Sequence, residues 1–134
     1  MESYDRIAIT LPCKAEYVSV ARLAASGVAS RAGFDIDTVE DIKVAVSEVC
    51  SRIISVSENS SKQYEIEFNI CTDKLIVNFS SDIKKIDCIF QNDEDGLGMS
   101  IINAFMDAVE YCPENKSYML SMTKNFEVIS RNGL

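Results

Sequence analysis

Two charged residues on one predicted helix have types and a spacing that could support chemistry. Glu48 and Arg52 lie four residues apart, which places them one turn apart on the same helical face. An apolar stripe at Val46, Val49 and Ile53 runs beside them. By spacing alone the pair is equally typical of a surface ion pair, which stabilises a protein little. The spacing by itself therefore favours the ion pair, and a catalytic role needs further support.

A second candidate is the segment Asp95-Gly96-Leu97-Gly98, which directly precedes another predicted helix. Glycines allow close backbone approach, and the N–H groups of a helix start can bind an anion such as phosphate. A single Gly-x-Gly is weak evidence for such a site. A plain loop-to-helix junction explains the segment as well.

Composition removes several classes of function. The chain of 134 residues has no histidine, which excludes histidine acid–base chemistry, Ser-His-Asp triads and histidine metal sites. Its formal net charge is -8, so it should repel nucleic acid and anionic lipid. This charge favours a basic protein partner over a nucleic acid, although most of the carboxylates serve solubility.

The remaining composition predicts a single cytoplasmic domain that covers residues 1–134. The five cysteines are odd in number and lack CxxC spacing, which argues against a zinc site and against a disulfide framework. The first residues are polar and charged, unlike a signal peptide. No apolar run approaches the length of a membrane span.

Apolar periodicity predicts the element order β-α-α-β-β-α-β. Strands are expected at residues 6–11, 64–71, 75–79 and 117–123, and helices at residues 15–32 and 37–56. A third helix should open at Gly96, extend through Val109 and end at Cys112-Pro113. Gly33 suits a helix C-terminal cap, and Asp37 with Glu40 has capping-box spacing.

These elements predict an α/β two-layer sandwich of the α+β type. The central hairpin excludes an all-parallel sheet. A mixed, mainly antiparallel sheet with helices on one face buries every apolar stripe.

Taken together, the segments resemble the anti-sigma-factor serine/threonine kinases of Gram-positive stress-response and sporulation pathways, within the GHKL ATPase superfamily. The resemblance covers about residues 7–126 and is strongest at residues 15–18, 22–23, 26–31, 40–48, 96–107 and 122–124. It implies the histidine-kinase-like ATPase fold of Bergerat type. It also implies a protein that binds a sigma factor, phosphorylates an antagonist (the anti-anti-sigma factor) and uses ATP and Mg²⁺.

The resemblance assigns Glu48 as the general base toward the attacking hydroxyl. The family's Mg²⁺-binding asparagine corresponds to Arg52 here. A guanidinium offers no lone pair to a metal, so Arg52 should repel Mg²⁺ or pair with Glu48. The sequence therefore predicts no metal ligand at this position.

The family's adenine-reading Asp-x-Gly motif is also altered. Ser81 or Asp82 occupies the aspartate position and no glycine follows. The segment that corresponds to the family's ATP lid, residues 80–95, is short. Gly96, Leu97 and Gly98 keep a candidate phosphate cradle, so the nucleotide-binding set is Arg52, Ser81, Asp82, Gly96, Leu97 and Gly98.

This sequence matches the family's partner-binding residues better than its nucleotide-binding motifs. Arg22 matches a family arginine that contacts both the sigma factor and its antagonist, and Tyr17 lies in the same matching stretch. Members of the family are commonly dimers, so a homodimer is expected.

Three hypotheses follow from the sequence. The first is an anti-sigma regulatory factor with an eroded ATP site and weak or no kinase activity. The second is an active ATP-dependent serine kinase that phosphorylates the anti-anti-sigma factor. The third is a non-catalytic dimerisation or interaction module.

Overall fold

Five strands form one sheet in the order β1-β2-β3-β5-β4, and each pairing is antiparallel. The computed structural model describes residues 5–57, 62–81, 89–90 and 96–126. The strands are β1 (Asp5–Pro12), β2 (Gln63–Ile70), β3 (Lys74–Ser81), β4 (Ala108–Tyr111) and β5 (Leu120–Asn125). Strands β2 and β3 form the predicted hairpin.

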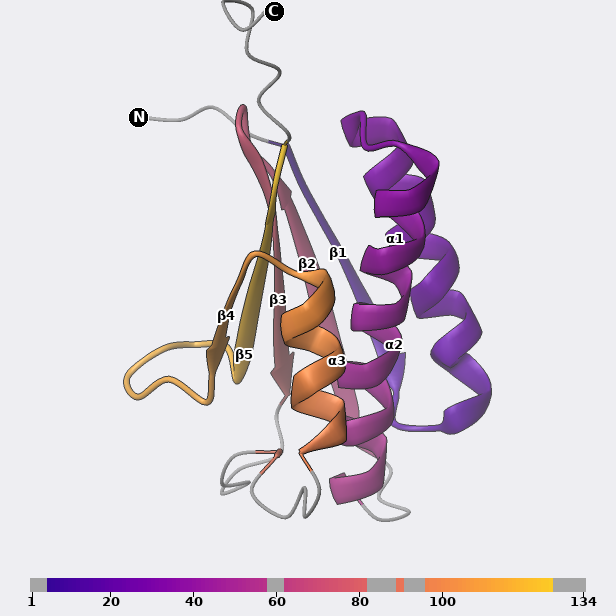
Figure 1. Ribbon diagram of the computed structural model, residues 1–134. Helices are drawn as coiled ribbons and strands as arrows, with labels where there is room; N and C mark the ends of the chain where they lie inside the picture. Colours follow the sequence, from indigo (N-terminus) through magenta and orange to yellow (C-terminus); the bar gives the residue numbers. More distant parts are fainter. Residues whose placement is uncertain (1–4, 58–61, 82–88, 91–95, 127–134) are drawn as a thin grey trace, which may run out of the picture.

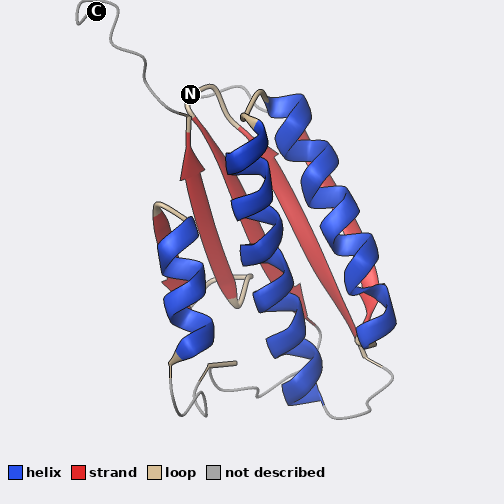
Figure 2. Ribbon diagram, turned by 45° about the vertical axis from the view of Figure 1, so that its right-hand side comes forward, coloured by secondary structure: helices blue, strands red, loops and turns tan. Residues whose placement is uncertain are grey.

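The helices cover one face of this sheet, as Figures 1 and 2 show. They are α1 (Val18–Ala32), which follows the short 3-10 turn η1 (Ala15–Tyr17), α2 (Ile36–Ser57) and α3 (Leu97–Phe105). Helix α2 lies between α1 and α3 in Figure 2. The two-layer sandwich predicted from the apolar stripes is confirmed.

The core lies between the two layers. Phe68, Phe79 and Met122 from the sheet are fully buried, as are Ile42 and Ile53 from α2. Burial raises the pKa of the Cys50 thiol to about 12. A buried neutral thiol of this kind is unreactive, which agrees with the prediction that Cys50 is a core residue.

The junction between α1 and α2 was predicted in part. Gly33 adopts a left-handed conformation with φ 110° and its N–H donates to the carbonyls of Ala29 and Ser30. It caps α1 as expected, because glycine tolerates positive φ. The predicted capping box is wrong: the Oδ1 atom of Asp35, two residues before Asp37, accepts the Thr38 N–H at 2.9 Å.

The third helix is shorter than predicted, and a strand was missed. Helix α3 ends at Phe105, and Met106 is extended with ψ 156°. Residues Ala108–Tyr111 form β4 on β5 instead of continuing the helix to Val109. The N–H of Asp107 donates to the Thr123 carbonyl at 2.9 Å. Pairing with β5 thus overrides the helical spacing of Val109.

The cysteines follow the prediction incompletely. Cys13, Cys50 and Cys71 are buried. Cys112 is disulfide-bonded, which the spacing of the cysteines did not predict. No group of histidine, cysteine and acidic side chains among the described residues could hold a metal ion.

The sheet face away from the helices carries a polar network centred on Glu67. Its carboxylate accepts hydrogen bonds from the side-chain amides of Asn69 at 3.0 Å and Asn78 at 3.3 Å, and from Arg6, with which it forms an ion pair. The bond from Asn69 contributes most to lowering the pKa of Glu67 below its ordinary value of 4.5, against the opposing effect of burial. The network therefore stabilises the folded chain more when Glu67 is ionised than when it is protonated.

This network predicts a specific loss of stability in acid. Because the pKa of Glu67 is lower in the folded chain than in the unfolded chain, its contribution is complete above the ordinary pKa and disappears as pH falls through the folded value. We expect the urea midpoint of the wild type to fall more than that of Glu67→Gln between about pH 6 and about pH 3. Equal losses in the two proteins would contradict the assignment.

Candidate functional site

A polar stripe on α2 lines a small cavity at the start of α3. The stripe consists of Glu48, Ser51, Arg52 and Ser55, at helical positions i, i+3, i+4 and i+7. Phe90 and the α3 residues Leu97, Gly98 and Ile101 complete the lining of a cavity of about 270 Å³. The structure therefore brings together Glu48, Arg52, Leu97 and Gly98, four of the residues that the sequence singled out.

The backbone at Gly96 explains how α3 starts beside this cavity. Gly96 precedes the first helical residue with φ 66°, in the left-handed region. Glycine adopts this conformation without the steric cost that a side chain adds. The turn directs the first residues of α3 toward α2, and α2 and α3 pack together. The Gly96-Leu97-Gly98 segment thus has a structural role in forming the cavity.

Arg52 makes its contacts with the segment that follows β3, not with Glu48. Its Nε donates to the carbonyl of Ile89, and its Cζ lies 5.8 Å from the ring centroid of Phe90. Phe90 in turn makes an edge contact with Tyr111, with centroids 5.5 Å apart. Within the described residues no ion pair joins Arg52 to Glu48. The structure therefore does not show the expected pairing of Arg52 with Glu48.

These contacts do not suit a magnesium–nucleotide complex. The guanidinium is a permanent cation without a lone pair, and the buried residues Ile89 and Phe90 hold it in the cavity. Arg52 therefore does not fit the role of a Mg²⁺ ligand at this position.

Ser81, one of the two candidates for the adenine-reading position, does not line this cavity. Ser81 is the last residue of β3, and its hydroxyl donates to the Gln63 carbonyl at 3.0 Å. It lines a different cavity of about 300 Å³, together with residues of β1, β2 and β3. Asp82, the other candidate, lies outside the described residues. The structure thus does not bring Ser81 to the cavity that contains Glu48.

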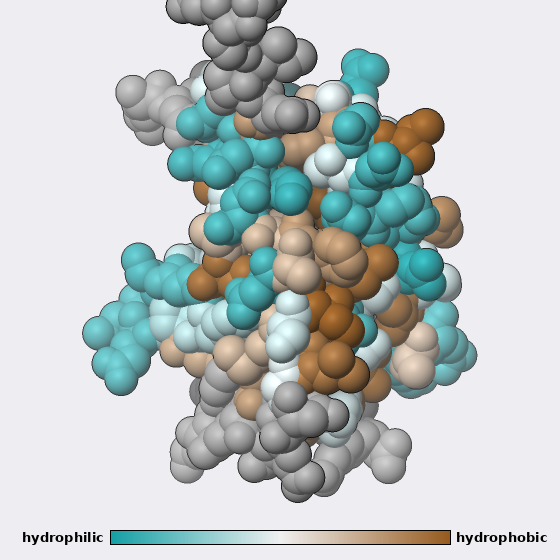
Figure 3. Space-filling model, in the orientation of Figure 1, coloured by the Kyte–Doolittle hydropathy of each residue, from teal (hydrophilic) through white to brown (hydrophobic). Residues whose placement is uncertain are grey.

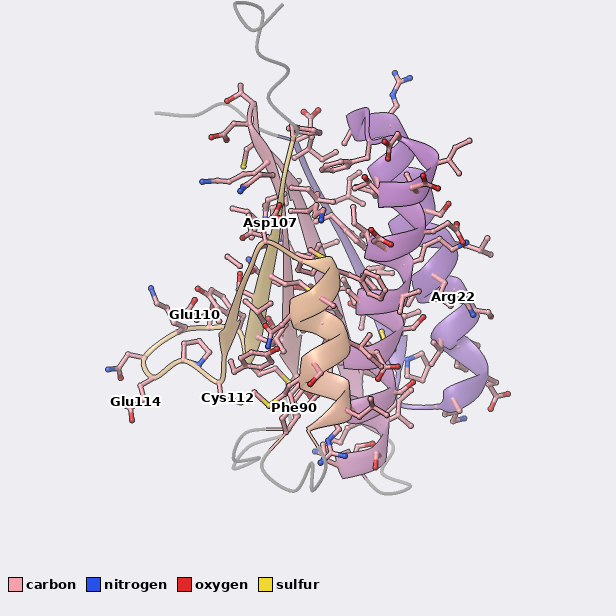
Figure 4. The ribbon with its side chains drawn as sticks, in the orientation of Figure 1. Arg22, Phe90, Asp107, Glu110, Cys112 and Glu114 are labelled. Carbon is pink, nitrogen blue, oxygen red and sulfur yellow. The ribbon has the colours of Figure 1, made fainter. Side chains whose placement is uncertain are left out.

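The predicted partner-binding residues lie at the other side of the helical layer. Arg22 projects from α1, and Figure 4 shows it well away from Phe90. Tyr17, in the turn before α1, is 36% exposed. No ion pair engages Arg22 among the residues that the structure describes. Its side chain is exposed to solvent.

A larger cavity contains none of the predicted site residues. It measures about 610 Å³ and is lined by the turn before α2 and the end of β5. Lys124 is engaged there with the Phe105 carbonyl at 2.8 Å and with Asp107 at 3.8 Å. The stacked rings of Phe34 and Phe126, with centroids 4.5 Å apart, form part of its wall. Two of the charged groups that line this cavity, Lys124 and Asp107, already form an ion pair with each other. The size of the cavity alone therefore does not identify it as the functional site.

Sequence reasoning missed four cavity residues, Ser51, Ser55, Phe90 and Ile101, and the two serines left a signal. Ser51 and Ser55 share the helical face of Glu48 and Arg52, so the polar stripe could have been found by its spacing. Phe90 follows a segment without regular periodicity, so nothing local indicated that it would meet Arg52.

Comparisons with known proteins agree with this architecture. Residues 11–124 match the family model for the histidine kinase-like ATPase domain. The serine-protein kinase RsbW of Listeria innocua is 33% identical, over 96% of this chain and 94% of that protein. The RsbW proteins of Oceanobacillus iheyensis and Halalkalibacterium halodurans are 36% and 31% identical, over 92% and 90% of this chain and 89% and 83% of theirs.

These matches extend across both layers of the sandwich and include α1, α2 and α3. No helix of the described chain has the length and apolar character to span a bilayer. The chain therefore belongs to the anti-sigma-factor serine-kinase family, within the histidine kinase-like (GHKL) ATPases.

Proposed function

We propose that this protein is an anti-sigma factor that holds a sigma factor on a surface that includes α1 and has lost metal-dependent kinase activity. An anti-anti-sigma protein would release the sigma factor by competing for that surface. The setting would be the cytoplasm, in a stress-response or sporulation pathway, and the working form would be a homodimer.

One observation carries the loss of kinase activity. Arg52 stands where the family's metal-binding asparagine is expected, and it is held by the Ile89 carbonyl and the Phe90 ring. A metal that approached this site would meet a fixed positive charge. Phosphoryl transfer relies on Mg²⁺ to neutralise the charge on the phosphates. The cation therefore opposes the binding of Mg·ATP.

A different observation supports the docking role. Arg22 is exposed on α1 and makes no ion pair within the described part of the chain. Arginine is enriched at protein interfaces, where its planar guanidinium pairs with carboxylates. The relatives named above share the whole domain, including this helix.

Calorimetric titration tests the proposal directly. We expect Mg·ATP to bind more weakly than about 10 μM, which corresponds to about 7 kcal/mol. In parallel, each sigma factor encoded in the same genome is titrated with the purified chain, and one of them should bind. Tight Mg·ATP binding would contradict the eroded site, whereas the failure of every sigma factor would contradict the docking role.

The second candidate is an active serine kinase, and the cavity that Glu48 and Gly98 both line favours it. Glu48 still lies beside Gly98 and the start of α3, as a general base and a phosphate cradle would require. Incubation with labelled ATP, the anti-anti-sigma protein and several divalent metals distinguishes the two. Transfer of phosphate that is lost in Glu48→Ala would establish the kinase.

A further inference from the structure

The larger cavity, of about 610 Å³, lies at the N-terminal end of α2. Three separate stretches line it: residues 33–35 and 38 at the junction of α1 and α2, Asp107 after α3, and residues 124–126 at the end of β5. Figure 4 shows Asp107 at the opposite end of α3 from Phe90. The volume is within the range of about 300–1,000 Å³ that is typical of small-molecule sites, and no residue of the Glu48 cavity contributes to the lining.

The charged groups of this cavity leave an excess of negative charge. The Nζ atom of Lys124 donates to the Phe105 carbonyl at 2.8 Å and lies 3.8 Å from Asp107, so its charge is already offset. The Oδ2 atom of Asp107 accepts the Asn125 N–H at 2.7 Å. Asp35 is exposed and forms no ion pair with a described residue. The lining therefore holds two carboxylates against one ammonium group, which favours a ligand that brings a positive charge.

The start of α2 holds the carboxylate of Asp35 in place. Its Oδ1 atom accepts the Thr38 N–H at 2.9 Å. Hydrogen bonds from the side chain and the backbone of Thr38 lower the pKa of Asp35 below its ordinary value of 3.8, so the carboxylate is ionised at neutral pH. A carboxylate that is already positioned binds a cation with a smaller loss of conformational freedom.

Two aromatic rings supply an apolar part of the wall. The rings of Phe34 and Phe126 stack with centroids 4.5 Å apart and an interplanar angle of 20°. The stack joins the junction of α1 and α2 to the end of β5, so it holds these two walls of the cavity together. The face of an aromatic ring attracts a cation, and its apolar surface packs against an alkyl chain. Carboxylates and aromatic rings in one cavity thus suit an organic cation.

We propose that this cavity binds an organic cation, an alkyl chain that ends in a guanidinium or primary ammonium group. The charged end lies at Asp35 and Asp107, and the alkyl chain packs against Phe34 and Phe126. Two sources supply this chemistry: a free small amine, or a lysine or arginine side chain of a protein. The inference goes beyond the proposed function, because the Arg52 cavity takes no part in it.

Titration of the ¹⁵N-labelled full chain with butylguanidine, followed by NMR, tests the proposal. We expect saturable shifts of the Thr38 and Asn125 amides, with a dissociation constant below about 1 mM. Butylurea has the same planar end group without the charge, and neither it nor MgCl₂ at matched ionic strength should produce these shifts. A short peptide, acetyl-Gly-Arg-Gly-amide, is titrated in parallel, and the tighter of the two cations identifies the source. Absence of saturable shifts with both cations would overturn the proposal, as would equal binding of butylurea.

Asp35→Asn tests the role of the charge without removing the helix cap, because asparagine caps a helix about as well as aspartate. It should weaken the binding of butylguanidine about tenfold and change the melting temperature little. Asp37→Asn is the matched control and should bind like the wild type, since Asp37 is an exposed acid that does not line the cavity. An equal loss in both variants would show mere attraction to an acidic surface and overturn the proposal. The sigma-factor titration does not depend on this cavity, so the two proposals fail separately.

Discussion

Replacement of Phe79 by alanine should lower the free energy of unfolding by about 3–5 kcal/mol. The Phe79 side chain is fully buried between the layers, and its neighbours across the sheet, Ile66 and Leu120, are fully buried too. Rigid neighbours on both strands cannot collapse into the space that the ring leaves. Since a domain is stable by only about 5–15 kcal/mol, the loss would be a large part of the total.

Urea unfolding followed by circular dichroism measures this loss. Ile7→Ala on the edge strand β1 is the matched control, because Ile7 is 41% exposed and should lose less than about 1 kcal/mol. Similar losses in the two variants would show that Phe79 does not lie in the core as described.

The second large effect is expected for Arg52→Ala, which should cost about 2 kcal/mol of unfolding free energy. Its guanidinium donates to the carbonyl of Ile89, a buried residue, and lies over the ring of Phe90. Removal of the charged donor leaves that carbonyl without this bond, and an unsatisfied buried acceptor is costly. The substitution also removes the contact that ties the Ile89–Phe90 segment to α2.

Arg22→Ala provides the control, because it removes an exposed arginine from the neighbouring helix without breaking an ion pair in the described chain. Its loss should stay within about 0.5 kcal/mol. Amide hydrogen exchange gives a second readout, since the amides near Phe90 should exchange faster in Arg52→Ala alone. Equal stability of Arg52→Ala and Arg22→Ala would show that Arg52 is merely a surface residue.

The structural role of Arg52 bears on how a kinase-like domain could work without the kinase reaction. In the proposed function the arginine at the metal position is a structural residue, because it holds the segment after β3 against α2. The docking helix α1 lies at the other edge of the helical layer, as Figure 4 shows for Arg22 and Phe90. Changes in the cavity could therefore leave partner binding intact.

A further exposed apolar surface lies between α2 and α3 (Figure 3). Apolar surface gathers in Figure 3 where these two helices lie side by side. Leu97, at the rim of the cavity with Glu48, is 59% exposed there. Nothing among the described residues at that rim indicates the chemistry of a partner.

Much of the fold could be predicted because its signals are local. The alternation in β2 and β3 follows from their sequence, and so does the long apolar stripe of α2. The left-handed cap at Gly33 needs only a glycine at a helix end. The capping residue of α2 was misplaced by two positions, because Asp35 and Asp37 are chemically alike and only the backbone decides which one caps.

The candidate site could be predicted only in part. Glu48 and Arg52 share a helical face by spacing, and the cavity confirms that they lie together with Gly98. The partner of Arg52 could not be predicted, because Ile89 and Phe90 are 37 and 38 residues away along the chain. Ser81 was grouped with this site through a resemblance, yet it lines another cavity.

The sequence by itself determined the class of the fold, the apolar stripe of α2 and the cation at position 52, because periodicity and residue type are properties of short segments. Only the tertiary structure decided that residues 108–111 form a strand on β5 and that Arg52 turns toward Ile89 and Phe90 instead of Glu48. The physical reason is that strand pairing and buried hydrogen bonds join groups distant in the chain, and their free energy outweighs local preference.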